Sequence, residues 1–151
     1  MTEQMGGPFV QVATFCQVAI VESTGQASLI RIIDRITLNI PPGADPVALQ
    51  QKQPLQITLV VILKSGLFKG KATITIRPVT PSGTILPPAQ FPILLEGDDR
   101  GNQIIMPMAL ALPEEGLYWF EILVNEATAT KVPLRLIHQP ATLVQRALPS
   151  E

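Results

Sequence analysis

Apolar and polar residues alternate along most of this chain with a period of two, and turn-forming residues interrupt the alternation about every ten positions. Successive side chains of a β-strand point to opposite faces, so this alternation indicates strands that are buried on one side. Fifteen prolines and ten glycines argue against long helices. Short strands at this spacing are typical of a β-sandwich or a β-barrel.

The interruptions divide the chain into candidate strands. The alternation predicts strands at 9–21, 27–40, 55–64, 71–79, 103–112, 117–125 and 131–138. Residues 65–70 contain two glycines and are expected to form a hairpin turn between the third and fourth of these strands. The proline-rich segment 84–95 is compatible with an edge strand or with irregular structure, because proline donates no backbone hydrogen bond.

Two short helices are predicted outside the strands. Asp45 followed by Pro46 matches a helix N-cap with proline at the first helical position, which predicts a helix at 45–51. In the tail, Leu143 and Leu148 are spaced to share one face of a second short helix.

The length of 151 residues matches a single domain, since domains cluster near about 100–150 residues. We divide the chain into an N-terminal extension at 1–8, a β-sandwich domain at 9–138 and a C-terminal tail at 139–151. Charged residues make up only 15% of the chain, against about 25% in typical globular proteins. This composition rules out general disorder.

A tyrosine follows the tight turn at 112–116 by two residues. In immunoglobulin-type sandwiches, a tyrosine in this position bonds back to the upstream backbone and fixes the crossing between the sheets. We therefore expect Tyr118 to point inward, together with Phe120 and Ile122. The predicted fold class is an all-β, immunoglobulin-like antiparallel β-sandwich of seven to eight strands.

Two parts of the chain carry a resemblance. Phe15-Cys16 and the stretch 22–36 resemble the opening of a family of small bacterial single-domain β-sandwich proteins of unknown function. The stretch 116–124, with Val132-Pro-Leu134, resembles the closing hairpin of that family. The resemblance covers roughly residues 9–138, and it implies a fold without implying any catalytic residue.

Residues that carry chemistry are scarce. His138 is the only histidine and Cys16 the only cysteine, so a Ser-His-Asp or Cys-His site would have to use His138. A thiol in the middle of a strand is usually inert core, and one histidine with one cysteine cannot complete a structural zinc site. We therefore expect no enzyme activity, no cofactor and no metal. The alternative is a sandwich that binds carbohydrate or calcium through the oxygen-rich loop 96–102, with Glu96, Asp98 and Asp99.

Net charge is −1, with 11 basic and 12 acidic residues, so no basic excess marks a nucleic-acid binder. The uncharged stretches 4–21 and 78–95 contain glutamines or prolines, and neither is expected to span a membrane. A single cysteine favours a reducing compartment, so the expected location is the cytoplasm.

An apolar outer face is the feature most suggestive of function. If Tyr118 and its same-parity neighbours point inward, the alternation turns five large apolar side chains outward: Val60, Ile62, Trp119, Leu123 and Ile137. In an immunoglobulin-type sandwich their three strands are expected to be neighbours in one sheet. A contiguous apolar patch is normally covered or used.

Two coverings of that face compete. The C-terminal tail, through Leu143 and Leu148, could fold back over its own sheet, or a second copy or a different protein could pack there. The sequence thus favours an interaction or structural module that self-associates or docks to a protein partner.

Overall fold

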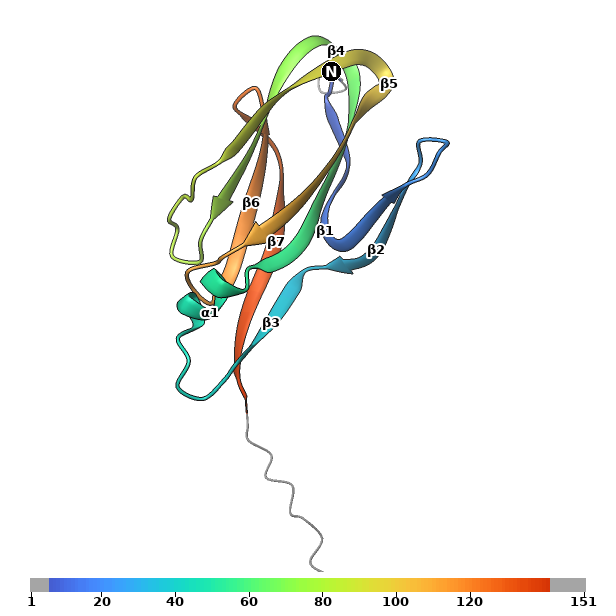
Figure 1. Cartoon of the computed structure of the whole chain (residues 1–151). Helices are drawn as coiled ribbons and strands as arrows, with labels where there is room; N and C mark the ends of the chain where they lie inside the picture. The colour runs from blue at the N-terminus through green and yellow to red at the C-terminus, as the bar shows by residue number, and fades with distance from the viewer. Residues whose placement is uncertain (1–5, 142–151) are drawn as a thin grey trace, which may run out of the picture.

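The computed structural model describes residues 6–141, which form seven strands and one short helix (Figure 1). The elements are β1 (Phe9–Val21), β2 (Ala27–Ile33), β3 (Arg35–Ile40), α1 (Pro46–Lys52), β4 (Leu55–Val79), β5 (Ala89–Leu110), β6 (Gly116–Val124) and β7 (Ala127–Pro140). No helix in this part of the chain is long and apolar enough to cross a bilayer.

Strands β4 and β5 are unusually long, and they form one antiparallel hairpin that bends in the middle. The bend lies where the register shifts on either side of the Gly66–Asp98 pair. Gly66 and Gly97 have φ of 63° and 92°, a region that L-residues rarely occupy. At Gly101, a Cβ atom would lie 1.6 Å from the carbonyl oxygen of Leu63, so only glycine fits the closest approach. The bend carries both strands from one sheet into the other (Figure 1).

The bend divides the paired strands into two layers. Sheet I has the order β2–β1–β4–β5 and uses residues 55–64 of β4 and 101–110 of β5. Sheet II has the order β5–β4–β6–β7–β3 and uses the other halves of the two long strands. All pairings are antiparallel except that of β3 with β7. This arrangement is an all-β, immunoglobulin-like sandwich and confirms the predicted fold class.

The core lies between the two sheets and is aliphatic with a few aromatic rings. Phe15 of sheet I and Phe120 of sheet II meet edge to face, with ring centroids 4.8 Å apart. Tyr118 is fully buried, and its hydroxyl donates to the carbonyl oxygen of Glu114 at 2.6 Å. The same hydroxyl accepts from the Glu114 amide at 2.9 Å. The predicted tyrosine corner is therefore present.

The short helix is also confirmed. α1 begins after Asp45, whose carboxylate accepts from the amide of Val47. Its only fully buried polar side chain, Gln50, forms two hydrogen bonds with the backbone of Leu112. Gln50 therefore ties the helix to the end of β5.

Three of the predicted elements are wrong: one turn, one loop and one strand. Residues 65–70 do not reverse the chain, because they form the bend within β4. The expected loop 96–102 is likewise part of β5, paired with β4 across the same bend. The predicted strand 27–40 divides at Asp34 into β2 of sheet I and β3 of sheet II, and the Asp34 carbonyl accepts from the Arg135 amide.

Candidate interaction surface

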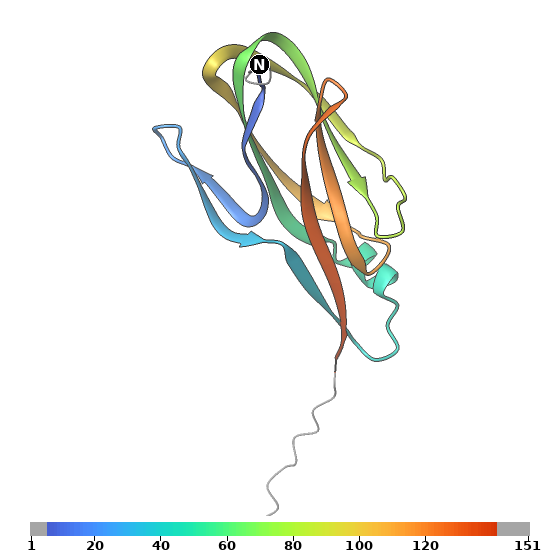
Figure 2. The ribbon, with the colours of Figure 1, turned by 180° about the vertical axis from the view of Figure 1, so that it is seen from behind.

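The outer half of the β1–β2 hairpin, residues 17–31, projects from the body of the sandwich and is called the arm below (Figures 1 and 2). β1 pairs with β4 only as far as Cys16, and beyond that point its one partner is β2. β2 pairs with β1 and with no other strand of the described chain. The arm is therefore a two-stranded ribbon without a third strand beside it.

Both faces of the arm are apolar. One face carries Val18, Ile20, Ile30 and Ile32, which are between 43% and 66% exposed. The other face carries Ala19, Val21, Ala27 and Leu29. An isolated two-stranded hairpin is marginally stable in water, and a ribbon usually packs at least one apolar face on something else. The side chains of this ribbon are thus placed for burial against a further surface.

The first of these faces continues onto the body of sheet I, where the central side chains, Cys16, Thr58 and Val60, are buried within the chain itself. Cys16 and Val18 follow Val12 and Thr14 on the outward side of β1, and Thr58, Val60 and Ile62 lie beside them on β4. Ile105 and Pro107 of β5 extend the same side to the far edge of the sheet. This continuous surface, the outer side of sheet I together with the matching side of the arm, is called the apolar face below.

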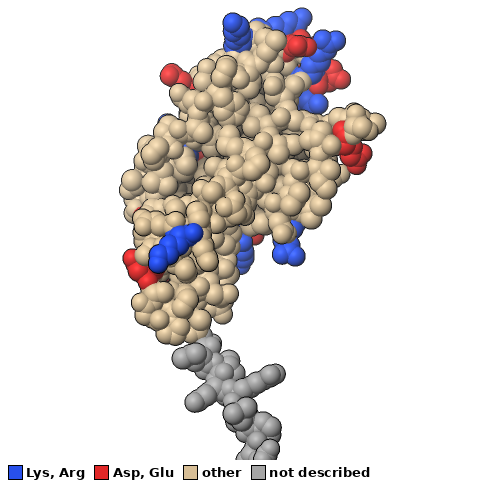
Figure 3. Space-filling view, in the orientation of Figure 1, with Lys and Arg blue, Asp and Glu red and all other residues tan. Residues whose placement is uncertain are grey.

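The apolar face carries no charged side chain between its edges; the first one along β4 is Lys64, at the upper rim. The space-filling view shows a broad uncharged area over the centre of the molecule, with the charged side chains mainly at its margins (Figure 3). Along a strand of an antiparallel sheet, apolar residues that face the core normally alternate with polar residues that face the solvent. The apolar face departs from that pattern.

The outer side of sheet II carries charged side chains among apolar ones. There Glu121 accepts from the Arg77 guanidinium at 2.7 Å and lies 3.6 Å from the Lys131 ammonium. The hydrogen bond from Arg77 is the largest influence on the pKa of Glu121 and lowers it below its ordinary value. Burial opposes this shift, and the positive charges of Arg77 and Lys131 add to the lowering. The outer side of sheet II thus carries an ion-paired cluster of charged side chains that the apolar face lacks.

The arm joins the body at Cys16 and again at its tip. Cys16 is fully buried, and burial raises the pKa of its thiol, as expected for an unreactive core cysteine. At the tip, the side-chain amide of Gln103 in β5 donates to the carbonyl oxygen of Gly25 at 2.9 Å. Since Gln103 lies on the outer side of sheet I, the arm leans toward that side.

The structure separates the residues that the sequence assigned to one outer patch. Val60 and Ile62 lie on the apolar face, with Val60 fully buried among its neighbours. Trp119, Leu123 and Ile137 lie on the outer side of sheet II, because β6 pairs with residues 74–79 of β4 and not with residues 55–64. The expected five-residue patch is therefore wrong as a unit. Trp119 is 40% exposed beside Val79 and Pro133, and Leu123 is buried.

The expected contributions of Leu143 and Leu148 fall outside the described residues. The arm itself was missed by the sequence prediction, although a signal was present. Residues 18–21 and 29–33 are apolar at nearly every position, whereas a strand with one hydrated side alternates.

The acidic residues at 96–102 do not form the expected ligand loop. Glu96 pairs with Arg100 at 3.2 Å, and Asp98 occupies the bend of β5. Nowhere within residues 6–141 do three histidine, cysteine, aspartate or glutamate side chains come together as a metal site would require.

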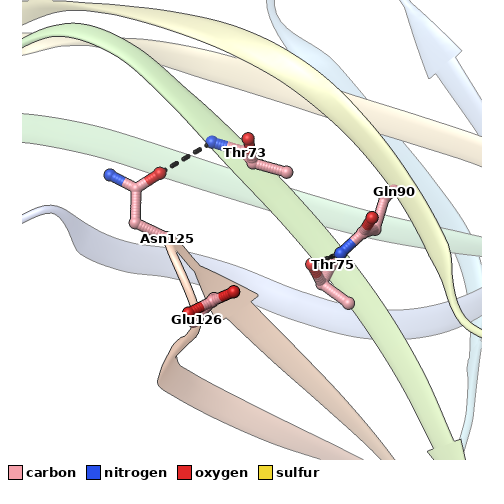
Figure 4. A pocket seen from close by; sticks show the side chains of 5 residues that line it. All are labelled: Thr73, Thr75, Gln90, Asn125 and Glu126. Carbon is pink, nitrogen blue, oxygen red and sulfur yellow. Dashed lines mark hydrogen bonds between the residues drawn. The ribbon is translucent and has the colours of Figure 1, made fainter.

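A polar hollow of about 460 Å³ lies instead at the outer side of sheet II, where the β6–β7 turn meets β4 and β5 (Figure 4). Its lining side chains are Thr73, Thr75, Gln90, Asn125 and Glu126. The side-chain oxygen of Asn125 already accepts a hydrogen bond from the Thr73 amide. The side-chain amide of Gln90 donates to the Thr75 hydroxyl. The Glu126 carboxylate faces this group of hydroxyl and amide side chains (Figure 4).

His138 lies at the far end of β7, away from Cys16. Its backbone amide donates to the Glu115 carboxylate at 2.6 Å. Both residues border a hollow of about 490 Å³ whose ten lining residues include four prolines. Neither the described surroundings of His138 nor those of Cys16 place a nucleophile and a base in contact.

The chain belongs to a family of unknown function, DUF6941, whose model matches residues 11–137. The match confirms the resemblance of the sequence to a small β-sandwich family of unknown function. No curated protein matches the chain.

Two solved structures are similar to it. An immunoglobulin-like protein from Pseudomonas aeruginosa is 10% identical with a TM-score of 0.44, over 88% of this chain and 98% of that one. The alkylpurine DNA glycosylase AlkC from Pseudomonas fluorescens, bound to DNA containing an abasic site analogue, is 12% identical with a TM-score of 0.39. That match covers 66% of this chain and 27% of the glycosylase.

Proposed function

We propose that this member of the family is a non-enzymatic protein-interaction module that binds a protein partner through the arm and the apolar face. The observation that carries the proposal is a projecting two-stranded ribbon, apolar on both sides, that continues into an uncharged sheet surface. Contiguous exposed apolar surface on a folded domain is typical of protein–protein contact.

The expected gain from covering the arm is sizeable. Fully burying a valine or isoleucine side chain stabilises by about 1.5–3 kcal/mol, so completing the burial of a half-exposed one contributes about 1 kcal/mol. The four side chains on the first side of the arm, Val18, Ile20, Ile30 and Ile32, therefore offer about 4 kcal/mol of binding free energy before the cost of association.

The buried free thiol of Cys16 favours a reducing compartment, and we place the module in the cytoplasm on that ground. Cell fractionation of the native protein tests the location, and recovery in an oxidising compartment would contradict it.

Site-specific photo-crosslinking in the native cells tests the interaction. A benzophenone amino acid replaces Ile32, which is 66% exposed on the arm, and a matched control replaces Leu94, which is 54% exposed on β5 in sheet II. We expect a discrete protein adduct from position 32 and none from position 94. The absence of an adduct at position 32, or the same adducts from both positions, would contradict the proposal.

A small polar ligand such as a carbohydrate is the second candidate, and it rests on the polar hollow and not on residues 96–102. Hydroxyl, amide and carboxylate side chains line the hollow, as polar ligands require, but no aromatic ring is among them. Calorimetric titration with a set of glycans tests this candidate, using Glu126→Gln as the variant that should weaken binding. A flat response to every glycan would remove it.

A further inference from the structure

We infer that the outer edge of β2 binds an extended apolar segment of another protein, which joins the arm as a third strand. The inference rests on the proposed function and states how the partner is bound. An extended chain that adds to a free strand edge gains main-chain hydrogen bonds, and its alternate side chains supply specificity. The backbone of β2 therefore determines what kind of segment can bind there.

Within the described chain, the outer edge of β2 has no strand beside it. β2 pairs with β1 alone, and no other ribbon runs along its outer edge in either view (Figures 1 and 2). A two-stranded hairpin is marginally stable in water, and a third strand with an apolar side makes a sheet far more stable. The arm is thus a sheet that lacks one strand.

The turn of the hairpin determines which backbone groups of β2 face outward. The amide of Glu22 donates to the carbonyl oxygen of Gln26 at 2.8 Å, so these two residues begin the ladder as a hydrogen-bonded pair. Hydrogen-bonded and non-hydrogen-bonded pairs alternate along antiparallel strands, and β1 and β2 keep one register as far as Ile33. Ser28 and Ile30 therefore direct their backbone groups toward β1.

By the same alternation, the backbone groups of Ala27 and Leu29 point outward, away from β1. The N–H and C=O groups of both residues are placed to bond an added strand. The regular ladder ends at Arg31, whose φ of 56° departs from strand geometry. The edge available to a partner is therefore residues 27–30.

The other edge strands of the described sandwich are protected against such addition, and β2 is not. Natural proteins block strand edges with proline or with charged side chains. β5 carries Pro92 and Pro107, one in each sheet, and β3 exposes Arg35 and Asn39. Residues 27–30 contain neither a proline nor a charge.

The side chains of β2 favour an apolar partner strand. Ile30 is 48% exposed and Ile32 is 66% exposed on one side of the arm, whereas Ala27 and Leu29 are half-buried on the other. Cross-strand pairs of β-branched or aromatic residues stabilise a sheet. An added strand therefore needs apolar residues beside Ile30 and Ile32.

A second β2 strand, added antiparallel across a two-fold axis, does not meet this need. Registers centred on residues 27–29 place Ile30 opposite a polar side chain. These polar side chains are those of Thr24, Gln26 and Ser28. Registers centred beyond Leu29 bring Arg31 of both copies into the ladder, where its backbone conformation interrupts the pairing. The occupant is therefore a segment of a different protein.

A synthetic peptide that alternates valine with threonine is the probe, because it favours an extended backbone and is apolar on one side. We expect saturable binding to the full chain in a calorimetric titration. In residue-resolved amide exchange by NMR, the amides of Ala27 and Leu29 should slow on binding, whereas those of Ser28 and Ile30 are already bonded to β1 and should change little. A peptide that alternates serine with threonine is the matched control and should bind at least about tenfold more weakly.

N-methylation of the probe separates strand addition from apolar packing and leaves the protein unaltered. The amides of the valines and those of the threonines lie on opposite edges of the extended peptide. Methylating the set that pairs with β2 should weaken binding at least about tenfold, and methylating the other set should change it less than about twofold. Equal effects of the two modifications would overturn the inference.

The outcomes separate this inference from the proposed function. Strand addition would be overturned if the peptide fails to bind at millimolar concentration, or binds without slowing exchange at Ala27 and Leu29. A position-32 crosslink to a protein would in either case leave the interaction module standing, and its absence would overturn the module. If the same amides slow as the concentration of the chain alone rises, a second copy occupies the edge, which would overturn the inference of a different protein.

Discussion

Gln103 and Gly25 are 78 positions apart in the sequence, yet the side-chain amide of Gln103 donates to the Gly25 carbonyl oxygen at 2.9 Å. Within the described residues, this is the only side-chain hydrogen bond between the tip of the arm and the body. It joins the tip of the arm to the outer side of sheet I.

Gln103→Ala should therefore loosen the arm without unfolding the sandwich. An exposed hydrogen bond contributes about 1 kcal/mol at most, so the global free energy of unfolding should change by less than that. Amide exchange in residues 18–30 should accelerate, as measured by mass spectrometry. The matched control is Gln90→Ala, which removes a similar amide bond to Thr75 on sheet II and should leave exchange in the arm unchanged.

Tyr118→Phe should lower the free energy of unfolding by about 1–3 kcal/mol, because the backbone amide and carbonyl of Glu114 both lose their partner. Urea denaturation at neutral pH measures the change. A loss below about 0.5 kcal/mol, within the usual range for neutral surface substitutions, would show that the tyrosine corner does not stabilise the fold.

Gly101→Ala should destabilise the sandwich by at least about 1–3 kcal/mol, the usual cost of forcing extra atoms into a packed site. The added Cβ would collide with the backbone carbonyl of Leu63, which cannot rotate away as a side chain could. Thermal and urea unfolding measure the loss. Gly6→Ala is the control, since nothing lies within 4 Å of a Cβ there, and a similar loss in both variants would refute the steric explanation.

The ion pair of Glu121 with Arg77 should make stability depend on pH in acid. Because folding lowers the pKa of Glu121, the unfolded chain binds a proton more readily than the folded one. The stabilisation is fully present above the ordinary glutamate pKa and is lost as pH falls through the lower folded value. Glu121→Gln should therefore cost stability at neutral pH, and its difference from wild type should shrink over that acidic window.

A double-mutant cycle supplies the control for this pair. In an Arg77→Met background, the Glu121→Gln substitution should lose most of its effect at neutral pH, as urea unfolding at several pH values would show. An undiminished effect in that background would mean that Lys131 or the solvent, and not Arg77, stabilises the carboxylate.

Local patterns predicted the elements of this fold better than their connections. Asp45-Pro46 and the turn before Tyr118 specify structure through neighbouring backbone groups, and both predictions are confirmed. Glycines at 66, 70 and 97 indicate a break in regular strand geometry, but a hairpin turn and a strand bend need the same positive φ. Which of the two forms depends on the strand paired alongside, and that partner is distant in sequence.

The ambiguity between a hairpin turn and a strand bend also led to the wrong position for the predicted apolar patch. Once residues 55–64 and 71–79 are treated as separate strands of a hairpin, Val60 falls beside Trp119 by analogy with other sandwiches. The bend puts these residues on opposite outer sides. The apolar character of an outer face was thus predictable from the alternation, whereas its position, and the arm that extends it, depended on long-range pairing.

Because β4 and β5 run through both sheets, the two sheets share two continuous strands and cannot separate from each other independently. Separating one sheet from the other would require the bend at Gly66 and Gly97 to straighten, and at that bend the two strands are still paired with each other. The sandwich should consequently melt as a single cooperative unit, whereas the arm, whose second strand pairs with β1 alone, can loosen separately.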